Sequence, residues 1–273
     1  MLVGYGAPVP GAPAVLYEVG EQRCVITLNR PDVLNAINRQ LEAELDAAIE
    51  AFTADPDLRV AIIVGAGGRA FSAGADLKEM ADRAATGEHE GGGAFRVPTA
   101  GSRRDVRACP KPVIAAIDGH CVAAGLELAL ACDIRVATRQ SSFGLPEPRR
   151  GLIAGSGLHH LNRMIPLGEA LRLQLTGGRI DAERAYQIGL VQELTADRRE
   201  MMARAHALAD DVVACAPMAV EAIKHIVTVG RNLPIEYSWA LAQPIQERLA
   251  ASEDAREGPR AFAEKRPPRW QRG

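Results

Sequence analysis

The sequence lacks an excess of charge of either sign, since 32 lysines and arginines stand against 34 aspartates and glutamates, a formal net charge of −2. It also contains no dense basic patch and no basic amphipathic helix. Proteins that bind nucleic acid or a membrane surface through charge need such features. We therefore expect neither a nucleic-acid partner nor a membrane partner.

The cysteines show no CxxC spacing, and their number is odd: Cys24, Cys109, Cys121, Cys132 and Cys215. This pattern favours free thiols in a reduced, cytoplasmic setting over a disulfide framework. The pair His120-Cys121 together with Cys132 does not have the spacing of a usual zinc site, so we expect no metal and interpret these cysteines as core residues.

Long apolar segments are also missing. Residues 1–13 have no basic start and no continuous apolar run, so we expect a flexible N-terminal segment and no signal peptide. No stretch approaches the length of a membrane span. What is present is a chain of 273 residues with 47% hydrophobic content, which is enough to bury one sizeable core.

The order of the predicted elements favours an α/β fold. Residues 23–29 alternate and are β-branched, which predicts a strand, and residues 60–64 form a short apolar run typical of a strand buried on both faces. Between them, apolar side chains spaced by four, four and three predict a helix with one buried face: Leu41, Leu45, Ile49 and Phe52. This order implies a parallel crossover.

Two glycine-rich stretches require separate interpretations. Residues 65–68 follow the second strand, as in a dinucleotide-binding protein, but the register GxGxxG into a helix is absent and a structural turn is the better interpretation. Residues 84–107 are polar and show no apolar period. We expect them to form a mobile loop that sets the substrate range.

The last part of the chain shows only helical patterns. After a short strand predicted at residues 190–194, helices are expected at 201–215, 217–229 and 234–250. Pro217 separates the first two, because proline is tolerated at a helix start but not inside. Cys215 and His225 fall within the apolar patterns, so we expect both to be packed.

Residues 110–157 carry the candidate catalytic groups. Residues 113–117 predict a buried strand, and residues 123–131 predict a helix made almost wholly of Ala and Leu. Glu127 lies inside that helix, where a carboxylate is costly unless it is hydrogen-bonded, paired or protonated. Glu147 follows 20 residues later, between two prolines that restrict its backbone. Two carboxylates on rigid supports indicate acid/base chemistry.

These segments resemble the signature of the crotonase, or enoyl-CoA hydratase/isomerase, superfamily. The matching text is TLNRPDVLNAIN, AFSAGADLKEM, AAGLELALACD, FGLPE and SEDAREGPRAFAEKR, in this order along almost the whole chain. The resemblance implies an α/β fold built as a spiral of repeated ββα units. After the flexible segment 1–13, residues 14–197 would form this core with its acyl-CoA site. Residues 198–273 would form a helical region through which subunits assemble as a trimer or hexamer.

The resemblance also implies roles for individual residues. The family stabilises the enolate of a thioester with two backbone N–H groups, which here are those of Ala75 and Ala124. Most members carry glycine at positions 123 and 124, and alanine still offers its N–H. Glu127 and Glu147 match the two catalytic glutamates, which hold a water between them with help from the Gly155 N–H. Glu127 would take the proton of this water as it attacks C3, and Glu147 would deliver a proton to C2.

For the coenzyme A part of the substrate, the resemblance points to three short segments. They lie near the first predicted helix, after the second strand and close to the C-terminus. Residues of the last segment would reach the coenzyme site of a neighbouring subunit. The matched residues are Asp32, Val33, Leu34, Ala73, Lys78, Phe262 and Lys265.

The predicted function is that of an enoyl-CoA hydratase, a hydro-lyase of fatty-acid or related acyl-CoA metabolism that adds water reversibly to a trans-2-enoyl-CoA and gives a 3-hydroxyacyl-CoA. Coenzyme A is part of the substrate, and no separate cofactor is expected. One alternative is an enoyl-CoA isomerase, which generally works with the later carboxylate alone. Another is a dehydratase of the carnitinyl-CoA type, to which the segment LPEPRRGLIAG is similar. A non-catalytic acyl-CoA-binding protein and a dinucleotide oxidoreductase are alternatives of other classes.

Overall fold

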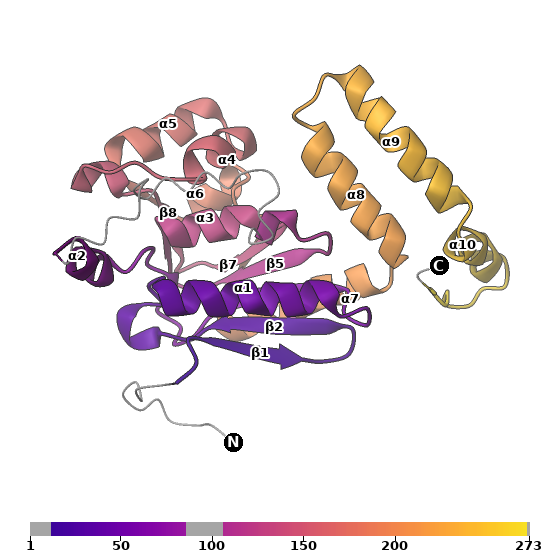
Figure 1. Cartoon of the computed structure of the whole chain (residues 1–273), viewed down its shortest axis with the longest axis horizontal. Coiled ribbons are helices and arrows are strands. Elements are labelled where there is room, and N and C mark those ends of the chain that lie inside the picture. The colour runs from indigo at the N-terminus through magenta and orange to yellow at the C-terminus, as the bar shows by residue number, and fades with distance from the viewer. Residues whose placement is uncertain (1–11, 86–105, 272–273) are drawn as a thin grey trace.

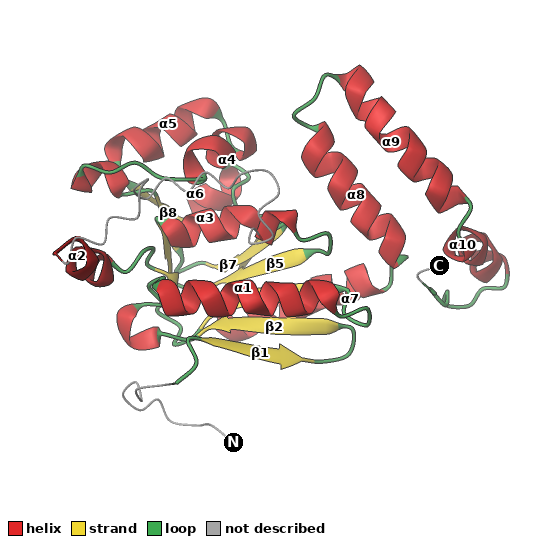
Figure 2. Ribbon diagram, in the orientation of Figure 1, coloured by secondary structure: helices red, strands yellow, loops and turns green. Residues whose placement is uncertain are grey.

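Two β-sheets form the centre of the fold (Figures 1 and 2) in the computed structural model, which describes residues 12–85 and 106–271. The first sheet has the strand order β1-β2-β3-β5-β7-β10. These strands are Val15–Val19, Arg23–Leu28, Val60–Gly65, Val113–Ile117, Ile134–Thr138 and Glu193–Thr195. The second sheet has the order β4-β6-β8-β9. Its strands are Ala70–Ser72, His120–Val122, Ser142–Gly144 and Arg179–Asp181.

Burial explains why the longer strands form where they do. β2 buries alternate residues, as the alternating sequence predicts, whereas β3 and β5 are buried at every position. Neighbouring strands in the first sheet are parallel except β1 and β2, and the pairing of Val25 with Ile62 sets the register of β2 on β3. The predicted parallel crossover is therefore confirmed.

The chain alternates regularly between the two sheets. The strands β3, β5 and β7 lie in order in the first sheet, and the strands that follow each of them, β4, β6 and β8, lie in order in the second. A helical segment follows each pair: α2 (Leu77–Ala85), α3 (Ala124–Ala131), and η3 (Glu147–Arg150) with α4 (Gly157–Met164). This arrangement is the predicted spiral of ββα units.

Helices cover both faces of the first sheet. α1 (Arg39–Ala54) buries the predicted stripe in the main core, and its Asn38 cap accepts a hydrogen bond of 3.0 Å from the Leu41 N–H. α7 (Arg198–Val213) covers the opposite face with Met201, Ala205 and Ala209. The remaining helical segments are η1 (Pro31–Val33), η2 (Val106–Ala108), α5 (Leu167–Thr176), α6 (Ala182–Gln187), α8 (Pro217–Gly230), α9 (Ile235–Ala250) and α10 (Glu253–Ala263).

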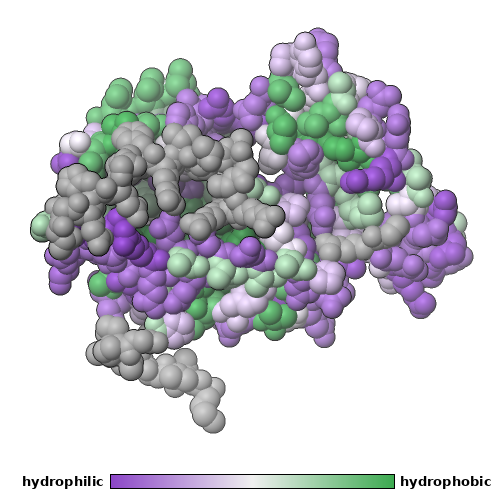
Figure 3. Space-filling view, viewed as in Figure 1, coloured by the Kyte–Doolittle hydropathy of each residue, from purple (hydrophilic) through white to green (hydrophobic). Residues whose placement is uncertain are grey.

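The helices α8 and α9 form an antiparallel hairpin beside the sheets (Figure 1). One set of large apolar side chains on this hairpin is exposed, and Figure 3 shows hydrophobic residues gathered over these helices. We call this set the hairpin apolar face: Ile223, Val227, Val229, Leu233, Ile235, Tyr237 and Trp239. Cys215 and His225 are exposed as well, so the expectation that both pack inside the subunit is wrong. The period predicts these helices correctly, but it does not show what each apolar helix face packs against.

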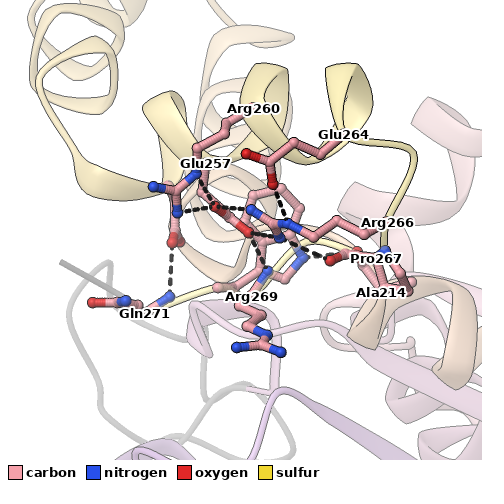
Figure 4. Close-up of polar contacts among 10 residues, drawn as sticks. Ala214, Glu257, Arg260, Glu264, Arg266, Pro267, Arg269 and Gln271 are labelled. Carbon is pink, nitrogen blue, oxygen red and sulfur yellow. Dashed lines mark hydrogen bonds and ion pairs between the residues drawn. The ribbon is translucent and has the colours of Figure 1, made fainter.

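A cluster of charged residues closes the end of α10 (Figure 4). The carboxylate of Glu257 is buried and accepts hydrogen bonds from the guanidinium groups of Arg260 and Arg266, at 2.6 and 2.5 Å, and from the Arg269 N–H at 2.8 Å. We call these four residues the C-terminal clasp. The bonds from Arg266, Arg269 and Arg260 hold the pKa of Glu257 well below its usual range.

The residues after the clasp are fixed to two helices. The Gln271 N–H donates a bond of 2.7 Å to Asp254 at the start of α10. The indole N–H of Trp270 donates a bond of 2.8 Å to the carbonyl of Ala214, directly after α7. The C-terminal tail therefore ties α10 to the helix that covers the first sheet.

Three further expectations have different outcomes. The strand predicted at residues 190–194 begins later, at Glu193, because the N–H groups of Leu190 and Val191 both bond to Ala185 O inside α6. Most of the predicted loop 84–107 lies outside the described residues. No single helix in the described ranges is long and apolar enough to cross a membrane, although the pair α7 and α8, bent by 106°, reaches that length and composition together.

Candidate active site

Glu127 lies in the first turn of α3, close to the start of α4. The N–H of Gly157 donates a hydrogen bond of 2.7 Å to Glu127 Oε1. Burial raises the pKa of Glu127, while the N–H groups of Gly157 and Gly155 act in the opposite direction. The Gly155 N–H, which was expected beside a catalytic water, thus lies next to this carboxylate.

Two glycines allow the close packing around Glu127. A Cβ on Gly157 would lie 3.2 Å from Glu127 Oε1 and 3.1 Å from Leu145 Cδ1. A Cβ on Gly125 would lie 2.5 Å from the carbonyl oxygen of Ser72, so only glycine lets α3 approach the second sheet this closely. The position of the Glu127 carboxylate depends on both contacts.

Glu147 lies between two prolines and is the first residue of η3, which follows β8. Its Oε2 atom is buried and has no hydrogen-bond partner among the described residues. Burial raises the pKa of Glu147, its own N–H lowers it, the charge of Glu127 raises it and Arg150 lowers it. A buried carboxylate oxygen without a donor is typical of a functional site rather than of a packed core.

The structure therefore brings the two predicted carboxylates together from α3 and η3 and gives them different hydrogen-bond surroundings. Glu127 receives two backbone N–H groups, which favour its ionised form. Glu147 has an oxygen without a donor and lies within reach of the Glu127 charge, which favours the protonated form. Burial raises the pKa of both carboxyls, and their positions give the site two groups that could take up or release a proton.

The N–H groups of Ala75 and Ala124 come from two segments that lie against each other. The Ile37 N–H donates to Gly74 O at 2.8 Å, and the Ile37 carbonyl accepts from the Asp76 N–H at 2.9 Å. Because N–H groups alternate in direction along an extended segment, the Ala75 N–H points away from Ile37. Ala124 is the first residue of α3, where helical N–H groups have no partner inside the helix. A Cβ on Gly74 would lie 3.3 Å from Ala124 N. Neither N–H has a hydrogen-bond partner among residues 12–85 and 106–271.

Ala123 holds the start of α3 in an unusual conformation. Its φ of 52° and ψ of −131° lie in the left-handed region that favours glycine. Two bonds fix it there: its N–H donates to Gly144 O at 2.9 Å, and its carbonyl accepts from the Glu127 N–H at 3.0 Å. Alanine therefore keeps a backbone geometry that glycine would adopt without strain.

The residues predicted to bind coenzyme A fall into two separate places. Near Ala75, the Ala73 N–H donates a bond of 2.9 Å to Leu34 O, which joins the segment after β4 to η1, and Lys78 lies exposed in the first turn of α2. Asp32 and Val33 are exposed in η1. These five predicted residues thus lie around one edge of the site.

Phe262 and Lys265 do not join this group within one subunit. Figure 1 shows α10 at the opposite end of the long axis from α2. Phe262 is 87% exposed, and Lys265, with a φ of 55°, ends the helix in the left-handed region. A role at a coenzyme site requires that they reach another subunit, as the resemblance implied.

The sequence predicts that Asp76 caps the helix beginning at Leu77, but it does not predict the roles of Asn35 and Arg30, which support the Ala75 segment. Asn35 is fully buried, with a φ of 53°, and its side chain donates to Ala66 O at 3.0 Å and to Ala70 O at 2.8 Å. Arg30 forms an ion pair of 3.0 Å with Asp76, whose carboxylate also caps α2. Burial raises the pKa of Asp76, but the bonds from Arg30 and from the Glu79 N–H outweigh this effect and hold the pKa below its usual value.

The described residues offer no metal centre. Within residues 12–85 and 106–271, no three His, Cys, Asp or Glu side chains are grouped so that they could hold an ion. Burial raises the pKa of the thiols of Cys24 and Cys132 to about 12, so neither is a nucleophile near neutral pH. The candidate catalytic groups are the two carboxylates and the two backbone N–H groups described above.

Known proteins are similar to this chain in sequence and fold. A profile of the family described as Enoyl-CoA hydratase/isomerase matches residues 18–273. The (E)-benzylidenesuccinyl-CoA hydratase of Thauera aromatica is 34% identical over 259 residues, which cover 93% of this chain and 97% of that protein. The carnitinyl-CoA dehydratase of Escherichia coli is 39% identical over 250 residues, which cover 90% and 93%. A crystal structure of an enoyl-CoA hydratase from Mycobacterium tuberculosis is similar with a TM-score of 0.86 at 40% identity, covering 96% of this chain and 100% of that one.

Proposed function

The chain belongs to the enoyl-CoA hydratase/isomerase family, and we propose that it adds water to the double bond of a trans-2-enoyl-CoA. Its relatives are named for benzylidenesuccinyl and carnitinyl thioesters, so membership alone does not assign the acyl group. The observation that carries the proposal is the pair of carboxylates from α3 and η3, because hydration needs a base and an acid at the same double bond. Glu127 Oε1 is held by the Gly157 N–H at 2.7 Å, and Glu147 Oε2 is buried with no partner among the described residues.

In the proposed reaction, the thioester oxygen accepts hydrogen bonds from the N–H groups of Ala75 and Ala124. Glu127 takes a proton from water while the water oxygen bonds to C3, and the π electrons of the double bond move onto the thioester oxygen. The resulting enolate collapses and takes a proton at C2 from Glu147. The proton held by Glu127 then returns to Glu147 through solvent, which restores the pair. Each N–H donor contributes about 10²–10³ in rate in comparable sites.

The test is the loss of absorbance at the enoyl-thioester band when crotonyl-CoA is added. Glu127→Gln and Glu147→Gln should each lower kcat by about 10²–10⁴ with little change in KM, since each removes one proton transfer but keeps size and hydrogen bonding. The two losses should combine less than additively, because both groups act on one water. Glu50→Gln, an exposed change on α1, is the matched control. Near-normal hydration by Glu127→Gln would refute the two-carboxylate mechanism.

Two other activities remain to be separated from hydration. Dehydration of a 3-hydroxyacyl-CoA is the same reaction in reverse, and a relative named as a dehydratase supports it. An isomerase acting through Glu147 alone should lose turnover of a 3-enoyl-CoA with Glu147→Gln and keep it with Glu127→Gln. A protein that binds acyl-CoA without turnover would require the site around Ala124 to be closed, and its N–H has no partner in the described part of the chain.

We also propose that the protein assembles as a trimer or hexamer. The hairpin apolar face supports this, because seven large apolar side chains exposed on two adjacent helices and the turn between them favour contact with another subunit. Assembly would also give Phe262 and Lys265 a coenzyme site to contact. A fully active monomer in light scattering would contradict this assignment. We further propose a cytoplasmic location, with coenzyme A of the substrate as the only coenzyme.

A further inference from the structure

The 3₁₀ geometry of η3 places Arg150 beside Glu147. A 3₁₀ helix has three residues per turn, so side chains three positions apart lie over one another on the same face. Glu147 and Arg150 are separated by three positions in η3. The charge of Arg150 lowers the pKa of Glu147 against the effect of burial, as expected for a cation close to this carboxylate.

The guanidinium of Arg150 has little to hold it within the described part of the subunit. Its one hydrogen bond there is long, at 3.5 Å from Nη1 to Pro146 O, and no carboxylate in that part forms an ion pair with it. The neighbouring Arg149 is different. Its Nε donates a bond of 3.0 Å to Thr176 O, and its side chain lies over Gly177, where a Cβ would be 2.8 Å from Arg149 Cγ. Arg149 therefore has a structural role in the fold, whereas the described contacts give Arg150 no such role.

The surroundings of Arg150 point to the acyl part of the substrate. The thioester oxygen is assigned to Ala75 and Ala124, and Glu147 faces the carbon chain. Arg150 is exposed and lies one 3₁₀ turn from Glu147, which places its charge on the side of the acyl group. After Arg150, Gly151 turns the backbone in the left-handed region, and Leu152 and Ile153 follow with 39% and 47% of their surface exposed. This segment places exposed apolar surface next to the positive charge of Arg150.

We propose that Arg150 determines specificity, and that the preferred enoyl-CoA carries an anionic group, such as a carboxylate, beyond C3. This inference rests on the proposed function, because it takes the thioester position from the hydration mechanism. A guanidinium binds a carboxylate through two parallel hydrogen bonds, and it repels a cationic group of similar size.

Three substrates that differ only at C4 provide the test. Crotonyl-CoA is neutral there, glutaconyl-CoA bears a carboxylate and crotonobetainyl-CoA bears a trimethylammonium group. The wild-type protein should have its highest kcat/KM with glutaconyl-CoA. Arg150→Gln should lower the ratio of kcat/KM for glutaconyl-CoA to that for crotonyl-CoA by about 10–100-fold, the usual worth of a charged hydrogen bond. Arg150→Glu should move the preference to crotonobetainyl-CoA.

The matched control is Arg149→Gln, which removes the same charge one residue away and should leave the ranking of the three substrates unchanged. An equal loss on all three substrates with Arg150→Gln would assign Arg150 to the coenzyme phosphates and overturn the proposal. An unchanged ratio would overturn it too.

A binding experiment separates this inference from the proposed function. Calorimetry with the saturated thioesters glutaryl-CoA and butyryl-CoA needs no turnover, and Arg150→Gln should weaken glutaryl-CoA binding alone by about 10-fold or more. If no enoyl-CoA is hydrated but this difference appears, the hydratase assignment fails and the role of Arg150 stands. If hydration is normal and both thioesters bind Arg150→Gln as they bind the wild type, the role of Arg150 fails alone.

Discussion

Replacing Ala123 by glycine should stabilise the protein. Ala123 has a φ of 52° and a ψ of −131°, a conformation that costs a non-glycine residue about 1–3 kcal/mol. Glycine removes this strain but makes the unfolded chain more flexible, which costs about 0.4–1 kcal/mol. The expected net gain is about 0.5–2 kcal/mol in the free energy of unfolding. For a chain of this size, the gain corresponds to a rise in Tm of about 2–4 °C per kcal/mol.

Thermal unfolding followed by circular dichroism measures this gain. Wild type and variant should be compared at one protein concentration, since the Tm of an oligomer depends on concentration. Ala47→Gly is the matched control, because Ala47 is exposed in the middle of α1. The same substitution in a regular helix should lower stability by about 1 kcal/mol. If Ala123→Gly and Ala47→Gly lower Tm alike, the reasoning about strain is refuted.

The same position should also affect activity. Ala123→Gly keeps the conformation that presents the Ala124 N–H, so hydration should stay within about threefold of wild type, well below the usual effect of losing an N–H donor. Ala123→Val places a β-branched residue where φ is positive, which backbone sterics exclude. A shift of α3 would then displace the Ala124 N–H, and kcat should fall by about 10²–10³. A fully active Ala123→Val would show that the N–H of Ala124 does not depend on this turn.

Three further outcomes follow from buried contacts. Asn35→Ala removes a side chain that pairs with three backbone groups and should lower the free energy of unfolding by about 2–4 kcal/mol, measured by urea denaturation. Glu127→Gln should raise Tm at neutral pH, because burial raises the pKa of Glu127 and its ionisation therefore opposes folding. This gain should vanish below about pH 4, where the wild-type carboxyl is protonated in both states, and a gain that is independent of pH would contradict the explanation. Gly157→Ala should lower kcat by about 10–100-fold with a small change in Tm, since the new methyl group would crowd Glu127 Oε1.

The sequence predicts those parts of the fold that have a period or a continuous apolar run. The alternation in β2, the buried runs in β3 and β5 and the four-residue spacing in α1 all correspond to observed elements. The strands of the second sheet are only three residues long. Such short segments carry no measurable period, so their pairing is decided by contacts that the sequence does not display.

For the site, the sequence motifs identify the two carboxylates but not their hydrogen-bond partners or the direction of their pKa shifts. The spacing of Glu127 and Glu147 predicted two catalytic carboxylates, and the fold brings both to one place. That Glu127 accepts a hydrogen bond from the start of α4 depends on Gly157, 30 positions away in the chain. The support by Asn35 depends on carbonyl groups more than 30 positions away. Contacts of this range follow from the tertiary fold, not from local sequence.

The position of the C-terminal clasp has a consequence for how the chain is made. A nascent chain folds from its N-terminal end, so both sheets and α7 can form before α10 has been synthesised. The bonds of Glu257 cannot form until Arg266 and Arg269 have been synthesised. The bond to the Ala214 carbonyl requires Trp270, which is 56 positions later in the chain. Residues 266–270 therefore fix α10 only after both sheets and α7 have been made, and a stop codon before Arg266 would produce a chain with intact sheets and an undocked α10.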